Sequence, residues 1–179
     1  MHGIILSELQ RYGRGKLGVT GWQKLLAEAG LSGRNYMVNT AYPDKEIAAL
    51  VAGAVQVTGL PKATLLEDFG RFIAPTLMMV YKSLLDPGWK TLDLIEHTEA
   101  SIHTVLRARD DAAEPPHLSV RRDGPRVAVL TYRSHRRLCA VAKGIAHGVA
   151  AHFGERLSIT EEACMAGGAP ACTLRLQVG

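Results

Sequence analysis

The sequence predicts an α+β fold, with helices in the first two-thirds of the chain and a small antiparallel sheet near the C-terminal end. Apolar residues recur at helical spacing as far as Arg107, whereas Arg126–Tyr132 is apolar and β-branched, as strands are. Leu157–Met165 and Ala171–Val178 flank the glycine- and proline-containing segment 167–170, which predicts a hairpin. With 179 residues, 47% of them hydrophobic, the chain has the size and composition of one globular domain.

Glycine and proline set the expected ends of the N-terminal helices. The first helix covers Met1–Tyr12 and ends at the glycine-rich segment 13–18. Thr20 opens a second helix, which Gly30 stops. A third helix begins after Pro43 and closes at Gly59.

The later helices are bounded in the same way. Because Pro75 lacks an N–H, we expect it to break or kink the helix that continues from Leu65, before Leu77–Leu85. Two further helices are predicted over Leu92–Arg107 and from Leu138 to Phe153.

Composition and charge argue against two classes of protein. No apolar run reaches the roughly 18 residues of a membrane span, so we expect a soluble, cytoplasmic protein without membrane contact. The net charge is +4, and arginines between positions 121 and 137 carry much of the excess. Tyr132 is the one aromatic residue among them, and no helix-turn-helix or RNA-binding signature accompanies them. We therefore expect no nucleic-acid partner.

Seven histidines require a test for metal sites. His97 and His103 share a predicted helix, but six residues at roughly 100° each place them about 120° apart, so one metal cannot bind both. His103 lies at the margin of the apolar stripe beside Ile102, and we take it as the inward residue. Alone, such a histidine is more often structural than a ligand. The others have no better claim: His2, His117, His135, His147 and His152.

Tyr132, Ser134 and Arg136 alternate along the predicted strand, so we expect them on one face. Two hydroxyls beside a guanidinium suit a carboxylate or a phosphate, because the arginine fork binds such groups through two hydrogen bonds. The simpler alternative is the solvated edge of a basic strand.

Together these residues resemble the haem nitric oxide/oxygen binding (H-NOX) family. The opening Met1-His-Gly-Ile-Ile5 is similar to the start of that family, and Tyr132-x-Ser134-x-Arg136 is similar to its YxSxR motif, which binds the haem propionates. With Pro115-Pro116 downstream, the resemblance implies that His103 is the proximal iron ligand and that Pro116 presses on the porphyrin and distorts it. It extends over nearly the whole chain.

The resemblance also implies where the cofactor lies. Haem b is expected between an N-terminal helical part, approximately residues 1–60, and an α+β part, residues 61–179. A single protein ligand leaves the opposite axial position of the iron open for a gas. The rest of the pocket should be apolar, and plain core packing would explain the same candidates for its lining: Ile5, Leu9, Leu77, Val141 and Ile145.

One position bears on the choice of gas. Family members that hold O₂ stably carry a tyrosine five residues beyond the YxSxR arginine, where this chain has Val141. Bound O₂ gains from a hydrogen bond and NO needs none, so Val141 indicates an NO sensor unless Tyr36 or Tyr81 reaches the pocket.

The three cysteines form a second candidate site. A hairpin centred on Gly168 places Cys164 opposite Cys172, and two thiolates so placed can share a metal. Some bacterial family members resemble this arrangement, with three such cysteines and a histidine on a structural zinc; here Glu161 stands where that histidine would fall. We expect either zinc on Cys139, Cys164, Cys172 and Glu161 or, without metal, buried thiols or a redox pair.

The resemblance therefore predicts a haem-based sensor that binds NO, and also CO, at ferrous iron and is not an enzyme. Its signal is expected to pass to a separate protein, for which the family suggests a histidine kinase or a diguanylate cyclase. Two alternatives remain: an O₂-binding or redox-sensing haem protein, and a haem-free interaction domain stabilised by zinc.

Overall fold

The computed structural model describes residues 3–109 and 113–179. Its elements follow the order α1 (Gly3–Glu28), α2 (Asp44–Thr58), α3 (Lys62–Val80), η1 (Lys82–Leu84), α4 (Thr91–Thr98), η2 (Glu99–His103), α5 (Thr104–Arg109), β1 (His117–Arg122), β2 (Val127–Arg133), α6 (Cys139–His152), β3 (Leu157–Ala163), η3 (Met165–Gly167) and β4 (Cys172–Val178). The predicted α+β class is confirmed. The expected helix start at Met1, and His2 with it, lie outside the described residues.

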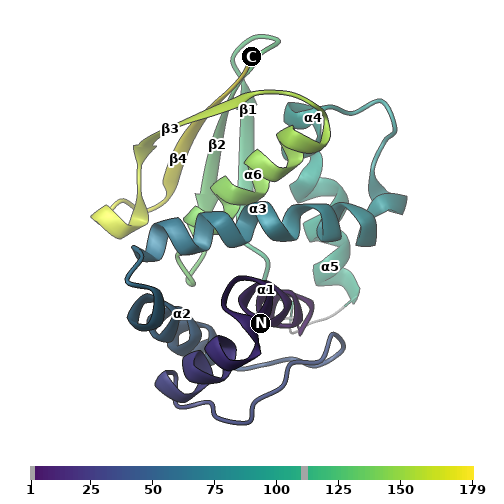
Figure 1. Ribbon diagram of the computed structural model, residues 1–179. Coiled ribbons are helices and arrows are strands. Elements are labelled where there is room, and N and C mark those ends of the chain that lie inside the picture. The colour runs from purple at the N-terminus through teal and green to yellow at the C-terminus, as the bar shows by residue number, and fades with distance from the viewer. Residues whose placement is uncertain (1–2, 110–112) are drawn as a thin grey trace.

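The sheet has four antiparallel strands in the order β1-β2-β4-β3. Helix α6 lies across one of its faces, α3 packs beneath α6, and α1 and α2 lie farther from the sheet (Figure 1). The layer between the sheet and the helices is closed by fully buried side chains such as Ala128, Leu174 and Leu176. The predicted hairpin is β3–β4, with a bulge between Glu161 and Ala163.

Helices α3 and α6 touch through glycine. A Cβ atom on Gly70 would stand 2.3 Å from the carbonyl oxygen of Val141, and one on Gly144 would stand 2.0 Å from that of Glu67. Backbones this close admit no side chain at either position. The contact fixes the wall of α6 that carries Val141 and Ile145.

A second cluster of buried side chains joins α1 and α2 and includes Trp22 and Leu50. The two expected helices meet within the glycine-rich segment 13–18, as predicted: Gly18, with φ of 71°, leaves helical geometry and kinks α1 there. The first of them runs on past Tyr12, and Gly13 packs against the Trp22 ring, which a Cβ there would approach to 2.4 Å.

The structure differs from expectation at two further places: the helix does not break at Pro75, and a strand forms over His117–Arg122. Helix α3 continues through Pro75 to Val80, because the packing of Ile73 and Ala74, both fully buried, outweighs the lost hydrogen bond. Strand β1 was not expected in its basic sequence; it pairs with β2, and its half-buried Leu118 and Val120 pack against the sheet core.

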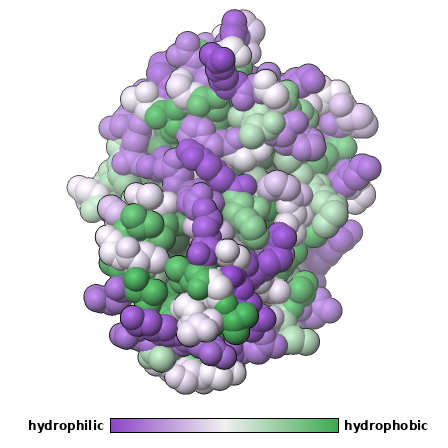
Figure 2. All heavy atoms as spheres, viewed as in Figure 1, coloured by the Kyte–Doolittle hydropathy of each residue, from purple (hydrophilic) through white to green (hydrophobic). Residues whose placement is uncertain are grey.

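The surface carries mixed side chains, and Figure 2 shows hydrophobic residues in small groups among hydrophilic ones. Among the described residues, no single helix is long and apolar enough to cross a membrane, and the pair α2 and α3, bent by 109°, passes only by length and composition. The basic cluster is partly neutralised, since Arg122 pairs with Asp93 and Glu96.

Candidate functional site

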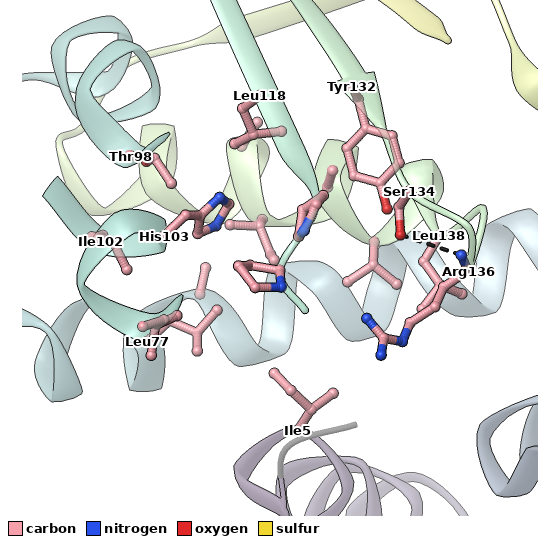
Figure 3. A pocket seen from close by; sticks show the side chains of 18 of the residues that line it. Ile5, Leu77, Thr98, Ile102, His103, Leu118, Tyr132, Ser134, Arg136 and Leu138 are labelled. Carbon is pink, nitrogen blue, oxygen red and sulfur yellow. Dashed lines mark hydrogen bonds between the residues drawn. The ribbon is translucent and has the colours of Figure 1, made fainter. Parts of the chain in front are cut away.

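A cavity of about 310 Å³ lies between α1, α3, α6, the helix α4–η2–α5 and the sheet. This volume falls in the range of roughly 300–1,000 Å³ that is usual for ligand sites. Figure 3 shows His103 on one side, Ser134 and Arg136 on the other, and Ile5 reaching in from α1. Every residue that the sequence assigned to the pocket lines this cavity: Ile5, Leu9, Leu77, His103, Pro116, Tyr132, Ser134, Arg136, Val141 and Ile145.

His103 reaches the cavity from the π-helical segment η2, where its side chain is 12% exposed. Burial lowers the pKa of His103 despite the opposing effect of Glu99, so the imidazole is neutral near pH 7. Single π-turns inside α-helices are frequent at functional sites. His97 lies outside: it is exposed and stacks on Trp89 with the ring centroids 4.8 Å apart.

Glu99 is the polar partner of His103. Its Oε2 lies 3.0 Å from His103 Nδ1 and also accepts the backbone N–H of Leu118 at 3.0 Å, while Oε1 accepts from Arg107 at 2.8 Å. Burial alone would raise the pKa of Glu99, but these hydrogen bonds outweigh it and hold the pKa below its usual range. The sequence carried one signal for this contact, the spacing of four residues between Glu99 and His103.

We expected one face of a single strand to carry Tyr132, Ser134 and Arg136, but the structure places them on a strand and the turn that follows it. Tyr132 belongs to β2, but the strand ends at Arg133, and Ser134 and Arg136 lie in the turn before α6. Ser134 Oγ accepts the backbone N–H of Arg136 at 3.2 Å, which holds the turn. Burial raises the pKa of Tyr132 to about 12, so its hydroxyl keeps its hydrogen and can donate.

The Arg136 guanidinium binds protein carboxylates. Its Nε donates to Asp44 at 2.8 Å, Nη2 donates to the Glu114 carboxylate at 2.9 Å, and Nη1 donates to the Glu114 carbonyl. His135 also contacts Asp44 at 2.9 Å. Sequence reasoning missed Asp44 and Glu114, because they are 92 and 22 residues from Arg136 and belong to no local motif.

The two tyrosines considered as donors differ in position. The Tyr36 hydroxyl binds Glu46 at 3.0 Å and does not line the cavity. Tyr81 does line it, and within residues 3–109 and 113–179 its hydroxyl has no hydrogen-bond partner. Burial raises the pKa of Tyr81, which keeps it neutral. Tyr81 is therefore the tyrosine to test beside Val141.

The cysteine sulfurs meet at the ends of three elements: Cys139 begins α6, Cys172 begins β4, and Cys164 follows β3. Cys164 Sγ lies 3.6 Å from Cys172 Sγ and 3.7 Å from Cys139 Sγ, and all three thiols are free. A zinc tetrahedron with Zn–S bonds of about 2.3 Å has edges of about 3.8 Å, close to these separations. Glu161 stands apart from this group and binds Lys143 at 3.1 Å. The structure thus assembles three of the four expected ligands.

The cavity fits haem by the chemistry of its donors. A neutral imidazole faces it, aliphatic side chains form most of its wall, and a guanidinium with two hydroxyls stands at the far end. These are the groups that an iron, a porphyrin and its propionates require.

Comparison with known proteins agrees with this fit. The haem-NO-binding family model matches residues 2–161. An H-NOX protein from Shewanella oneidensis, solved in the Fe(II)NO state, is 26% identical with a TM-score of 0.91, covering 100% of this chain and 99% of that one. The same organism's H-NOX domain in the Fe(II)CO state is 26% identical with a TM-score of 0.86, covering 100% and 99%.

More distant structures share the fold. The Fe(II) unliganded H-NOX protein from K. algicida is 20% identical with a TM-score of 0.88, covering 100% of this chain and 97% of that one. The chain matches none of the curated proteins with which its sequence was compared. From the matched residues, the fold and the cavity, the chain belongs to the haem-NO-binding, or H-NOX, family.

Proposed function

We propose that this protein is a haem-based sensor of nitric oxide. One observation carries the proposal: His103 and Arg136, which are separated in the sequence, line opposite sides of one apolar cavity. When bound, haem b would supply a ferrous iron that can coordinate a diatomic gas. His103 would be the protein ligand of that iron, and Tyr132, Ser134 and Arg136 would hold the propionates.

The helix Thr91–Arg109 is the element that carries a signal from this site. His103 belongs to it, and Glu99 joins it to Leu118, two residues beyond Pro116. A weaker bond at His103 would release this helix and the pressure of Pro116 together. The two-state change proposed is a shift of the N-terminal part, approximately residues 1–60, against residues 61–179.

The α6 side of the cavity wall supports NO over O₂. Val141 and Ile145 line it from α6 and offer no hydrogen-bond donor to a bound gas. The output belongs to a separate protein, a histidine kinase or a diguanylate cyclase, and the chain itself is not an enzyme.

The three cysteines favour a structural zinc as a second feature. Sulfur separations of 3.6 and 3.7 Å match an edge of a zinc tetrahedron, and the site ties the hairpin β3–β4 to α6. Cys139, Cys164 and Cys172 are the protein ligands, and Glu161 would have to leave Lys143 to become the fourth.

Absorption spectroscopy of two glycine variants tests the sensor proposal. His103→Gly should lose the protein ligand of the iron and recover a five-coordinate spectrum with free imidazole, whereas His97→Gly, on the exposed stack with Trp89, should keep the unmodified spectrum. Purified protein without a Soret band, or a ligand lost in His97→Gly and retained in His103→Gly, would refute the proposal.

A further inference from the structure

Glu99 binds His103 from outside the cavity, and the proposed function assigns it no part in iron binding. It lies four residues before His103, and a buried imidazole with two different nitrogens needs something to decide which nitrogen carries the hydrogen. The contacts of Glu99 determine which ring nitrogen of His103 carries the hydrogen.

Three donors converge on the Glu99 carboxylate. A glutamate is ionised near pH 7 at its ordinary pKa of about 4.3, and the backbone N–H of Leu118 and the guanidinium of Arg107, which can only donate, stabilise this carboxylate at both oxygens. A carboxylate has no hydrogen to give. The contact of 3.0 Å between Oε2 and His103 Nδ1 therefore requires the hydrogen on Nδ1.

The position of this hydrogen determines the other nitrogen of the ring. A neutral imidazole protonated at Nδ1 keeps a free lone pair on Nε2, and it is the lone pair that binds a metal. A carboxylate that draws the Nδ1 hydrogen also makes the ring a stronger donor to the metal. Arg107, bound to the other oxygen at 2.8 Å, reduces that pull by partly neutralising the carboxylate.

We propose that Glu99 is a positioning residue that holds His103 in the Nδ1–H form, presents Nε2 to the iron, and strengthens the Fe–His103 bond that NO must overcome, with Arg107 moderating the effect. This inference rests on the proposed function, since it assumes that His103 is the iron ligand. On this proposal, the ion pair between Glu99 and Arg107, on the side of the imidazole away from the iron, sets the strength of the Fe–His103 bond.

The test uses the full chain with Glu99→Gln, and Glu96→Gln as a matched control. Glu96 lies one turn earlier on the same helix, and its carboxylate binds Arg122 at 2.8 Å instead of a histidine. Resonance Raman spectra of the ferrous protein should show a lower Fe–His stretching frequency in Glu99→Gln and no shift in Glu96→Gln. Arg107→Gln should shift the band upwards, and this opposite sign keeps the inference testable if Glu99→Gln does not fold.

A second readout needs no iron. In the haem-free protein labelled with ¹⁵N, the ring nitrogens of His103 should report the hydrogen on Nδ1, and Glu99→Gln should raise the share of the Nε2–H form. A His103 that carries its hydrogen on Nε2 in the unmodified protein would overturn the inference. So would an Fe–His band at the same frequency in all variants, which would leave the proposed function standing. Absence of an Fe–His band from every variant, the unmodified protein included, would refute both.

Discussion

The Arg136 guanidinium supports two predictions of opposite sign. In Arg136→Ala the propionates lose a cation whose side chain is only 10% exposed, and a charge-assisted hydrogen bond contributes about 1.5–3 kcal/mol. At about 1.4 kcal/mol per factor of ten, haem should leave about 10- to 150-fold faster. In Glu114→Gln the guanidinium loses a competing carboxylate, itself 62% exposed, and such pairs contribute about 0.2–1 kcal/mol. Haem should then bind about 1.5- to 5-fold more tightly.

Transfer of haem to apomyoglobin measures the loss, and titration of the haem-free protein measures the affinity. Arg133→Ala is the control, because Arg133 is exposed at the end of β2 and does not line the cavity. If Arg136→Ala keeps haem as long as the unmodified protein, or Glu114→Gln loses haem as fast as Arg136→Ala, the guanidinium does not hold the propionates.

Three other predictions concern the gas, the metal and acid stability. Ferrous protein should bind NO and CO but hold no stable O₂ complex in air; a long-lived O₂ spectrum that disappears in Tyr81→Phe would show that Tyr81 supplies the missing donor. Elemental analysis should find about one zinc per chain, lost in Cys172→Ser, and protein purified without chelator that contains none would refute the metal site. Hydrogen bonds from Arg34 and Tyr36 outweigh burial and lower the pKa of Glu46, so its stabilising effect is complete above the ordinary pKa of about 4.3 and falls as pH drops through the lower folded pKa. Urea unfolding of Glu46→Gln at pH 7 and at pH 3 should show a smaller difference from the unmodified protein at pH 3, and a constant difference would contradict the assignment.

Residues whose role depends on local spacing could be predicted from the sequence. Helical periodicity placed His103 inward and His97 outward, and the structure agrees even though η2 is π-helical. The hairpin symmetry about Gly168 placed Cys164 near Cys172, and their sulfurs lie 3.6 Å apart. These relations hold because each involves one element or one turn.

Features that depend on packing between distant parts of the chain could not be predicted from the sequence. Pro75 stays inside α3 because the buried residues before it hold the helix in place, and Gly13 stays inside α1 because Trp22 packs against it. The carboxylate of Asp44 reaches Arg136 only because α2 folds back towards the turn after β2. No local pattern contains that information.

The glycine contact between α3 and α6 fixes the backbone of one cavity wall, whereas the side chains on that wall can be replaced. With Gly70 against the backbone of Val141, and Gly144 against that of Glu67, neither helix can move towards the other to absorb a larger side chain. A larger or more polar side chain at Val141 or Ile145 must therefore place its added atoms inside the cavity. The gas preference of this protein can thus be redesigned at these two positions. Any added atom at Gly70 or Gly144 would instead force α3 and α6 apart.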